Sequence, residues 1–187
     1  MTTDDVRRML DLVAAGPARL GTGEPRGRLL CVDGPAGSGK TTLARAVVAA
    51  APEAHLLHLD LLLDGWDGLA DVAATLVADV LEPLARGERA AYRRYDWHAR
   101  RFAERVPVPA TQLLVVEGVG AGSRATAPYR AASVWVEAST PLRRRRALAR
   151  DGDDFAPHWD AWAEQEARLF TAERTRATAD LRITTDL

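Results

Sequence analysis

The chain has 187 residues, of which 47% are hydrophobic and 27% are charged, and its formal net charge at pH 7 is -1. This length and composition are typical of one globular domain and exclude a disordered chain. The near-neutral charge gives no positive field for nucleic acid, the amino terminus carries acids where a secretory signal would carry bases, and no apolar run is long enough to span a membrane. We therefore expect a cytoplasmic protein that binds neither nucleic acids nor membranes.

The predicted elements alternate between helices and strands along the chain. Apolar residues at helical spacing, followed by a stretch rich in glycine and proline, predict an N-terminal helix and linker over 1–27, ahead of a single main domain over 28–187. Within that domain, short apolar runs predict strands at 29–33, 55–60, 112–117, 133–138 and 180–184, and helical spacing predicts helices at 39–51, 67–86, 141–151 and 157–177. This alternation predicts an α/β fold in which a five-stranded parallel sheet carries helices on both faces.

Acidic residues lie at or near the carboxyl end of four of the five predicted strands. They are Asp33, Asp60, Glu117 and Glu137. Ligands of parallel α/β sheets gather at the carboxyl ends of the strands, so these positions are the first candidates for a functional site.

The segment 34-GPAGSGKT-41 joins the first of these strands to an apolar helix. It matches the phosphate-binding pattern G-x-x-x-x-G-K-[ST] in the strand, loop and helix context that the pattern requires, and it predicts a P-loop NTPase fold. Glycines let successive backbone N–H groups point at one anion, which the positive end of the following helix also attracts. The predicted nucleotide-binding residues are Gly34, Pro35, Ala36, Gly37, Ser38, Gly39, Lys40, Thr41 and Thr42.

Lys40 is the only lysine of the chain, which carries 24 arginines. Lysine offers a compact charge on a thin stem, whereas the broad guanidinium of arginine would crowd the loop. We expect Lys40 to reach the outer phosphates of ATP and the Thr41 hydroxyl to bind Mg²⁺.

Several classes of P-loop protein are disfavoured by the sequence. The chain has no asparagine and no second lysine, so it lacks the Asn-Lys-x-Asp motif that reads guanine in ordinary GTPases. Its size and charge argue against a motor or a DNA-remodelling ATPase. A compact phosphotransferase, which holds a phosphate donor and a second small molecule, is the remaining class.

The order of five segments resembles the uridine kinase family of nucleoside kinases. These segments are GPAGSGKT, 58-HLD-60, 81-LEPLARGERAAYRRYDW-97, 114-LVVEGVGA-121 and 142-LRRRRALARDG-152, and the resemblance spans roughly residues 28–185. The chain departs from the family at Leu61–Leu63, where the family often has a polar residue and an aromatic one.

The resemblance implies roles for several residues. An aspartate at the position of Asp60 accepts the proton of the acceptor hydroxyl, and Arg146 and Arg150 lie on a lid that closes over the transferring phosphoryl group. Glu117 resembles a Walker-B acid that holds Mg²⁺ directly or through water.

The acceptor side is less sharply defined by the sequence. The resemblance places the segment Tyr95, Asp96 and Trp97 near a base and a ribose, although the same residues suit a packed loop. Trp66 suits a wall of the acceptor pocket and equally a place in the core.

These observations predict an ATP- and Mg²⁺-dependent kinase of a small hydroxyl compound, with a pyrimidine nucleoside as the acceptor that the resemblance implies. The alternatives are a kinase of a sugar, a vitamin precursor or an antibiotic, and a nucleotide-binding regulatory ATPase. The choice between ATP and GTP stays open, and a homo-oligomer is compatible with the sequence.

Overall fold

The computed structural model describes residues 2–186 and contains the predicted parallel sheet. The strands lie in the order β2-β5-β1-β6-β7, and each pair of neighbours is parallel. Their bounds are Arg28–Asp33 for β1, Ala54–His58 for β2, Leu113–Glu117 for β5, Arg130–Glu137 for β6 and Leu181–Thr184 for β7. All five predicted strands are therefore present, and the α/β fold class is confirmed.

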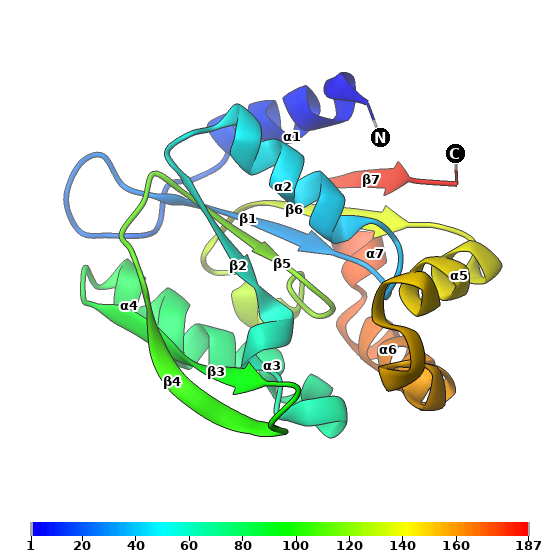
Figure 1. Cartoon of the computed structure of the whole chain (residues 1–187). Helices are drawn as coiled ribbons and strands as arrows, with labels where there is room; N and C mark the ends of the chain where they lie inside the picture. Colours follow the sequence, from blue (N-terminus) through cyan, green and yellow to red (C-terminus); the bar gives the residue numbers. More distant parts are fainter. Residues whose placement is uncertain (1, 187) are drawn as a thin grey trace.

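Helices cover both faces of this sheet (Figure 1). Alternate residues of β1 point to opposite sides: Leu30 and Val32 belong to one core, and Leu29 and Cys31 belong to the other. The first core is shared with α1 (Thr3–Ala15) and α2 (Lys40–Ala50), and the second with α3 (Val72–Leu76) and α6 (Trp159–Glu173). Burial on both faces explains why the central strands are continuously apolar.

The N-terminal helix α1 packs against β6 and α2. Its side chains Met9 and Val13 are buried in the core on that side of the sheet. A capping box between Thr2 and Asp5 starts the helix, and Gly16 ends it. The helix expected within residues 1–27 thus covers part of one face of the sheet.

The region predicted as one helix over 67–86 is irregular. It consists of a 3₁₀ turn over Gly65–Ala70, α3, a π-helical stretch over Val77–Leu81, and α4 over Glu82–Ala85. The predicted helix over 157–177 is likewise divided, because Arg174 adopts a left-handed conformation between α6 and the short α7 (Thr175–Thr178). The helix predicted at 141–151 is present as α5 (Thr140–Asp151).

A two-stranded antiparallel hairpin was not predicted. Its strands are β3 (Ala90–Asp96) and β4 (Arg101–Val108), which form a sheet separate from the main one. Tyr92 and Val108 are buried against the core on the α3 side. The hairpin lies beside the carboxyl end of β2 (Figure 1), because β3 packs against the 3₁₀ turn that follows that strand.

The end of β2 differs from its predicted position. The strand ends at His58, and residues Leu59–Leu62 form a 3₁₀ turn, so Asp60 lies just beyond the strand and not at its end. Leu62 and Leu63 are buried in the core, while Leu61 is half-buried against it. The turn forms because the apolar side chains after Asp60 pack inward. Across residues 2–186, no helix combines the length and the apolar character that crossing a membrane requires.

Candidate active site

The predicted phosphate loop connects β1 to α2 at the carboxyl edge of the sheet. Gly34 and Gly37 both have positive φ angles, and a Cβ atom at Gly37 would lie 2.2 Å from the carbonyl oxygen of Arg143. Within the described part of the chain, no side chain caps the first turn of α2 at Gly39. The loop therefore needs glycine for its path, and it leaves the positive end of a helix available for an anion.

Lys40 folds back over this loop. Its Nζ atom donates a hydrogen bond to the carbonyl oxygen of Pro35 at 3.0 Å, and its side chain is mostly buried. The hydroxyl of Ser38 is buried and has no hydrogen-bond partner among residues 2–186. The loop thus combines an enclosed ammonium group with an unsatisfied buried donor, a combination that fits a phosphate group.

A cavity of about 480 Å³ opens beside the loop. It is lined by Gly37, Gly39, Lys40, Thr41, Thr42, Arg45, Arg146, Ala147, Arg150 and Thr185. Four of these side chains are cations, and no acid lines the cavity within the described residues. Such a lining suits a polyanionic ligand of nucleotide size.

Thr41, in the first turn of α2, lies next to Glu117, the last residue of β5. The Thr41 hydroxyl donates to Glu117 Oε1 at 3.1 Å, and His58 Nδ1 lies 2.6 Å from the same oxygen. Burial opposes the ionisation of Glu117, but the hydrogen bond from His58 and the charge of Lys40 outweigh it, so the pKa of Glu117 lies below its ordinary value. An ionised carboxylate beside a hydroxyl provides the oxygen ligands that Mg²⁺ prefers, and these two residues fit such an ion.

Asp60 lies near this pair on the 3₁₀ turn after β2. Its side chain reaches solvent, yet the surrounding protein displaces much of its water, and this desolvation raises the pKa of Asp60, with the negative charge of Glu117 as the second cause. The charges of Lys40, Arg150 and His58 oppose the rise. An accessible carboxyl with a raised pKa is suited to accept a proton.

The residues predicted for the acceptor side are only partly brought together. Trp97 donates its indole N–H to the carbonyl oxygen of Asp60 at 3.2 Å, and its ring lies 4.8 Å from that of Trp66. Tyr95 is buried, with its ring edge-on to Trp97. Asp96 accepts the backbone N–H of Ala99 at 2.9 Å and so stabilises the hairpin turn, which lowers its pKa. Trp97 thus lies against Asp60 with Trp66 behind it, whereas Asp96 serves the hairpin turn.

Trp66 is the centre of a wider aromatic cluster. Its ring stacks on His158 at 4.4 Å and on Phe155 at 5.2 Å, and Trp162 contacts it edge-on. Trp66 is half-buried and packs against the core, with part of its ring left accessible.

The other two acids at strand ends have structural partners. Asp33 is buried and accepts hydrogen bonds from the backbone N–H groups of Gly34, Gly120 and Gly122. Burial raises the pKa of Asp33, and these three donors oppose the rise. Glu137 pairs with Arg176 at 2.7 Å. Asp33 therefore holds the start of the phosphate loop from inside the protein, whereas Glu117 bonds the Thr41 hydroxyl and Asp60 stays accessible.

The predicted lid arginines lie on α5. Arg146 donates to the hydroxyl of Thr185 at 2.8 Å and to its carbonyl oxygen at 2.7 Å, so it forms a fixed wall of the cavity. Arg150 pairs with Asp151 and acts through its charge on Asp60 and Glu117. Arg150 thus lines the donor cavity and also acts on the charge of Asp60.

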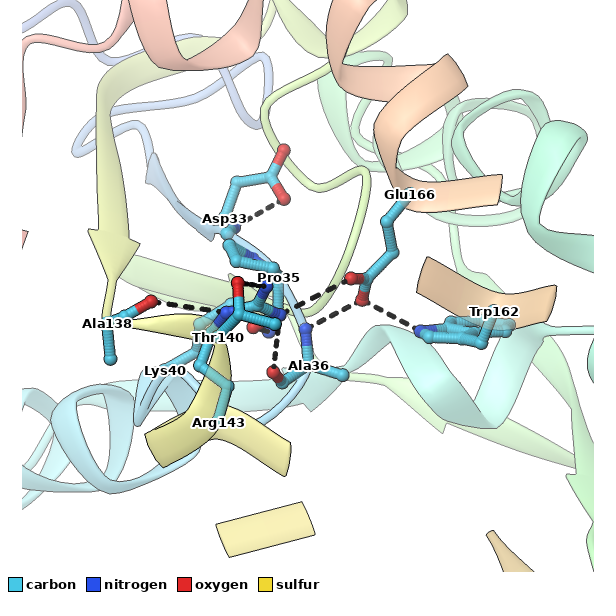
Figure 2. A network of polar contacts seen from close by, with 10 residues as sticks. Asp33, Pro35, Ala36, Lys40, Ala138, Thr140, Arg143, Trp162 and Glu166 are labelled. Carbon is cyan, nitrogen blue, oxygen red and sulfur yellow. Dashed lines mark hydrogen bonds and ion pairs between the residues drawn. The ribbon is translucent and has the colours of Figure 1, made fainter. Parts of the chain in front are cut away.

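Sequence reasoning missed Glu166 as a site residue. This α6 side chain is 3% exposed, and its Oε1 atom accepts the backbone N–H of Ala36 in the phosphate loop at 2.6 Å (Figure 2). A signal was present, because Glu166 falls on the same helical stripe as Trp159 and Trp162, where only buried side chains are expected.

Comparison with known proteins places the chain among P-loop kinases by fold. No protein-family model matches the sequence, and no curated protein matches it either. The structure superposes on a possible uridine kinase from Bacillus stearothermophilus with a TM-score of 0.64 and 18% identity, over 96% of this chain and 97% of that one. It superposes on a candidate fructose transport system kinase from Silicibacter sp. TM1040 with a TM-score of 0.60 and 21% identity, over 98% of this chain and 99% of that one. Likeness over the whole length of both proteins shows that this chain has the α/β fold of P-loop kinases.

Proposed function

We propose that the protein is an ATP- and Mg²⁺-dependent phosphotransferase that moves the γ-phosphoryl group of ATP to a hydroxyl group of a small molecule. One observation carries the proposal: the phosphate loop with Lys40, the pair Thr41 and Glu117, and the accessible Asp60 converge on one edge of the sheet. These are the three functions that phosphoryl transfer requires, namely a holder of the donor, a metal site and a group that orients the acceptor. The fold that the chain shares with a possible uridine kinase supports the same reading.

The residues divide the work as follows. Backbone N–H groups of the loop and the Lys40 ammonium hold the phosphates of ATP, and the arginines of the cavity wall add positive charge. Thr41 and Glu117 would hold Mg²⁺, which neutralises charge on the phosphate oxygens when it is bound. Asp60 orients the acceptor hydroxyl and takes its proton, and Arg150 stabilises the negative charge between donor and acceptor.

For the acceptor, we propose a pyrimidine nucleoside, uridine or cytidine, phosphorylated at its 5′-hydroxyl. The segments that resemble uridine kinases support this choice, as does the half-buried pair Trp66 and Trp97 beside Asp60, which offers aromatic surface for a base. The departure from the family at Leu61–Leu63 stands against it, because Leu62 and Leu63 pack into the core, Leu61 is half-buried, and none of the three offers a polar group to a nucleoside. The second candidate is a kinase of a sugar or another alcohol, and the fold shared with a candidate fructose transport system kinase favours it.

The test is ADP release from Mg-ATP in the presence of nucleosides, sugars and pantothenate-like alcohols. Stimulation by uridine or cytidine above all other acceptors is the expected result. Greater stimulation by a non-nucleoside would overturn the choice of acceptor and leave the kinase proposal in place. If no acceptor stimulates turnover but a protein partner does, the regulatory ATPase is the better account.

A further inference from the structure

The two peptide groups that flank Ala36 in the phosphate loop are each held by a side chain from another helix. The N–H of Ala36 donates to Glu166 Oε1 at 2.6 Å, and the carbonyl oxygen of Ala36 accepts from Arg143 Nη1 at 3.2 Å (Figure 2). Glu166 comes from α6 and Arg143 from α5, so two helices that are remote from the loop in sequence fix two of its consecutive peptide groups.

Both side chains that hold these peptide groups are themselves fixed. Glu166 Oε1 also accepts the indole N–H of Trp162 at 2.8 Å, and its Oε2 lies 3.8 Å from Arg143 Nη1. Arg143 donates in addition to the carbonyl oxygen of Ala138 at 3.2 Å and lies over the ring of Trp159. The two peptide groups on either side of Ala36 therefore meet a preformed pair of partners.

Burying the carboxylate of Glu166 costs free energy, and the need to fill space in the core does not explain why a carboxylate stands there. Glu166 is 3% exposed, and burial raises its pKa, although the charge of Lys40 and the donors Ala36 and Trp162 favour the ionised form. An apolar side chain on this stripe of α6 would pack without that cost. The specific contribution of Glu166 is the bond to a backbone N–H that would otherwise lie unpaired in the loop.

The geometry points to Glu166 as a positioning residue of the donor site, which acts together with Arg143 to fix the peptide groups on either side of Ala36. The next residues of the loop, from Gly37 onward, present the N–H groups that bind phosphate. The N–H of Gly37 belongs to the same peptide group as the carbonyl that Arg143 holds, so the orientation of these peptide groups sets the direction of the N–H groups that follow. Glu166 does not touch the phosphates in this account; it prepares the loop. The inference rests on the proposed binding of a nucleotide to this loop.

The experiment measures nucleotide affinity by calorimetry with Mg-ADP and with a non-hydrolysable ATP analogue, well below the melting temperature of each variant. Glu166→Ala should weaken binding by about 10-fold to 100-fold, the range expected when a charge-assisted bond to a buried partner is lost. Glu164→Ala is the matched control, because Glu164 lies on the same helix, is exposed and pairs with Arg168 on the surface. This variant should bind like the parent.

A conservative variant separates positioning from general support of the fold. Glu166→Gln keeps the side-chain volume and a carbonyl that accepts the N–H of Ala36, so it should recover part of the affinity lost in the alanine variant. If Glu166→Ala does not fold, Trp162→Phe removes the indole donor that orients Glu166 and keeps a ring in the core, and it should weaken nucleotide binding by at least about 3-fold.

The outcomes are distinct from those of the proposed function. Failure of the parent protein to bind any nucleotide would refute the function itself. A parent that binds, together with a folded Glu166→Ala variant or a folded Trp162→Phe variant of unchanged affinity, would refute the positioning role. A lower melting temperature without a change in affinity would also refute it, because Glu166 would then serve stability alone.

Discussion

Thr41 and Glu117 lie 76 positions apart in the sequence, and the hydroxyl of Thr41 donates to Glu117 Oε1 at 3.1 Å. The parallel register places both at the carboxyl edge of the sheet, since Glu117 of β5 pairs with Val32 of β1, just before the loop. A threonine predicted from a short motif and a glutamate predicted from a strand end thus form one candidate metal site.

Glu117→Gln should raise the Mg²⁺ concentration for half-maximal activity by about 10-fold or more, because a neutral amide is a weaker ligand and a weaker partner for bound water. A Mg²⁺ titration at saturating ATP measures the change. Glu137→Gln is the control, since Glu137 also follows a strand but pairs with Arg176 away from the loop. An equal effect of both variants would contradict the assignment of Glu117.

Lys40→Ala should fold and lose productive ATP binding, with turnover reduced by at least about 100-fold, because the loop amides remain while the outer phosphates lose their positive charge. Lys40→Arg should fail as well, since the enclosed path of Lys40 over Pro35 suits a slender chain. Calorimetry with Mg-ADP and a steady-state assay measure the two effects. Near-normal turnover of the arginine variant would show that the shape of the cation is unimportant here.

Asp60→Asn should keep its affinity for Mg-ATP and lose turnover by about 100-fold or more, the loss expected on removal of a positioned base. The measurements are kcat with the best acceptor and direct binding of an ATP analogue. Asp64→Asn provides the control, because Asp64 is an exposed carboxyl four residues further along. A parallel loss of ATP affinity would assign Asp60 to metal binding.

The pH dependence of kcat/KM should report Asp60, which must be ionised to take a proton. Its pKa is raised by desolvation and by Glu117, so the acid limb of the profile should lie at higher pH than for an ordinary aspartate. Arg150→Ala removes a positive charge that lowers this pKa, and it should move the limb to still higher pH. Arg145→Ala, an exposed residue of the same helix, should leave the limb in place. A shift toward lower pH in Arg150→Ala would refute this assignment.

Arg146 and Arg150 are expected to act on turnover more than on stability, because an arginine near the transferring group acts chiefly in the transition state. The effect should be clearest for Arg150→Ala, since Arg150 pairs only with the neighbouring Asp151. Arg146→Ala also removes two hydrogen bonds to Thr185, so it should lower the melting temperature as well. Thermal unfolding and kcat are compared for both variants. If the alanine variants melt at a lower temperature but keep normal turnover, Arg146 and Arg150 serve the stability of the fold and not the reaction.

Much of the fold follows from local patterns in the sequence. The five parallel strands are short, continuously apolar runs, and such runs are the expected signature of strands covered on both faces. The hairpin over Ala90–Val108 escaped prediction because its arginines interrupt the apolar alternation, and its register shifts between Arg93 and Tyr95. The end of β2 was placed too late because Leu59 continues the apolar run of the strand, although it already belongs to the 3₁₀ turn over Leu59–Leu62.

The site could be predicted where a motif fixes the chemistry and not where tertiary contacts do. Lys40 and Thr41 belong to a pattern whose spacing encodes their roles. Glu166 reaches Ala36 over 130 positions, and no local rule connects an acid on a late helix with a peptide of the phosphate loop. Asp96 was expected near the acceptor because its neighbours resemble a family motif, but its carboxylate accepts from Ala99 within the hairpin turn.

The enclosed position of Lys40 makes the protein suited to site-selective amine chemistry. Lys40 carries the only side-chain amine of the chain, since all other basic groups of the Lys and Arg class are guanidinium groups, which acylating reagents leave unmodified. Its Nζ atom is bonded to Pro35 and lines the cavity of about 480 Å³. The acylated peptide that contains Lys40 would therefore count the molecules whose donor cavity was empty, and its disappearance on addition of nucleotide would follow occupancy without any knowledge of the acceptor.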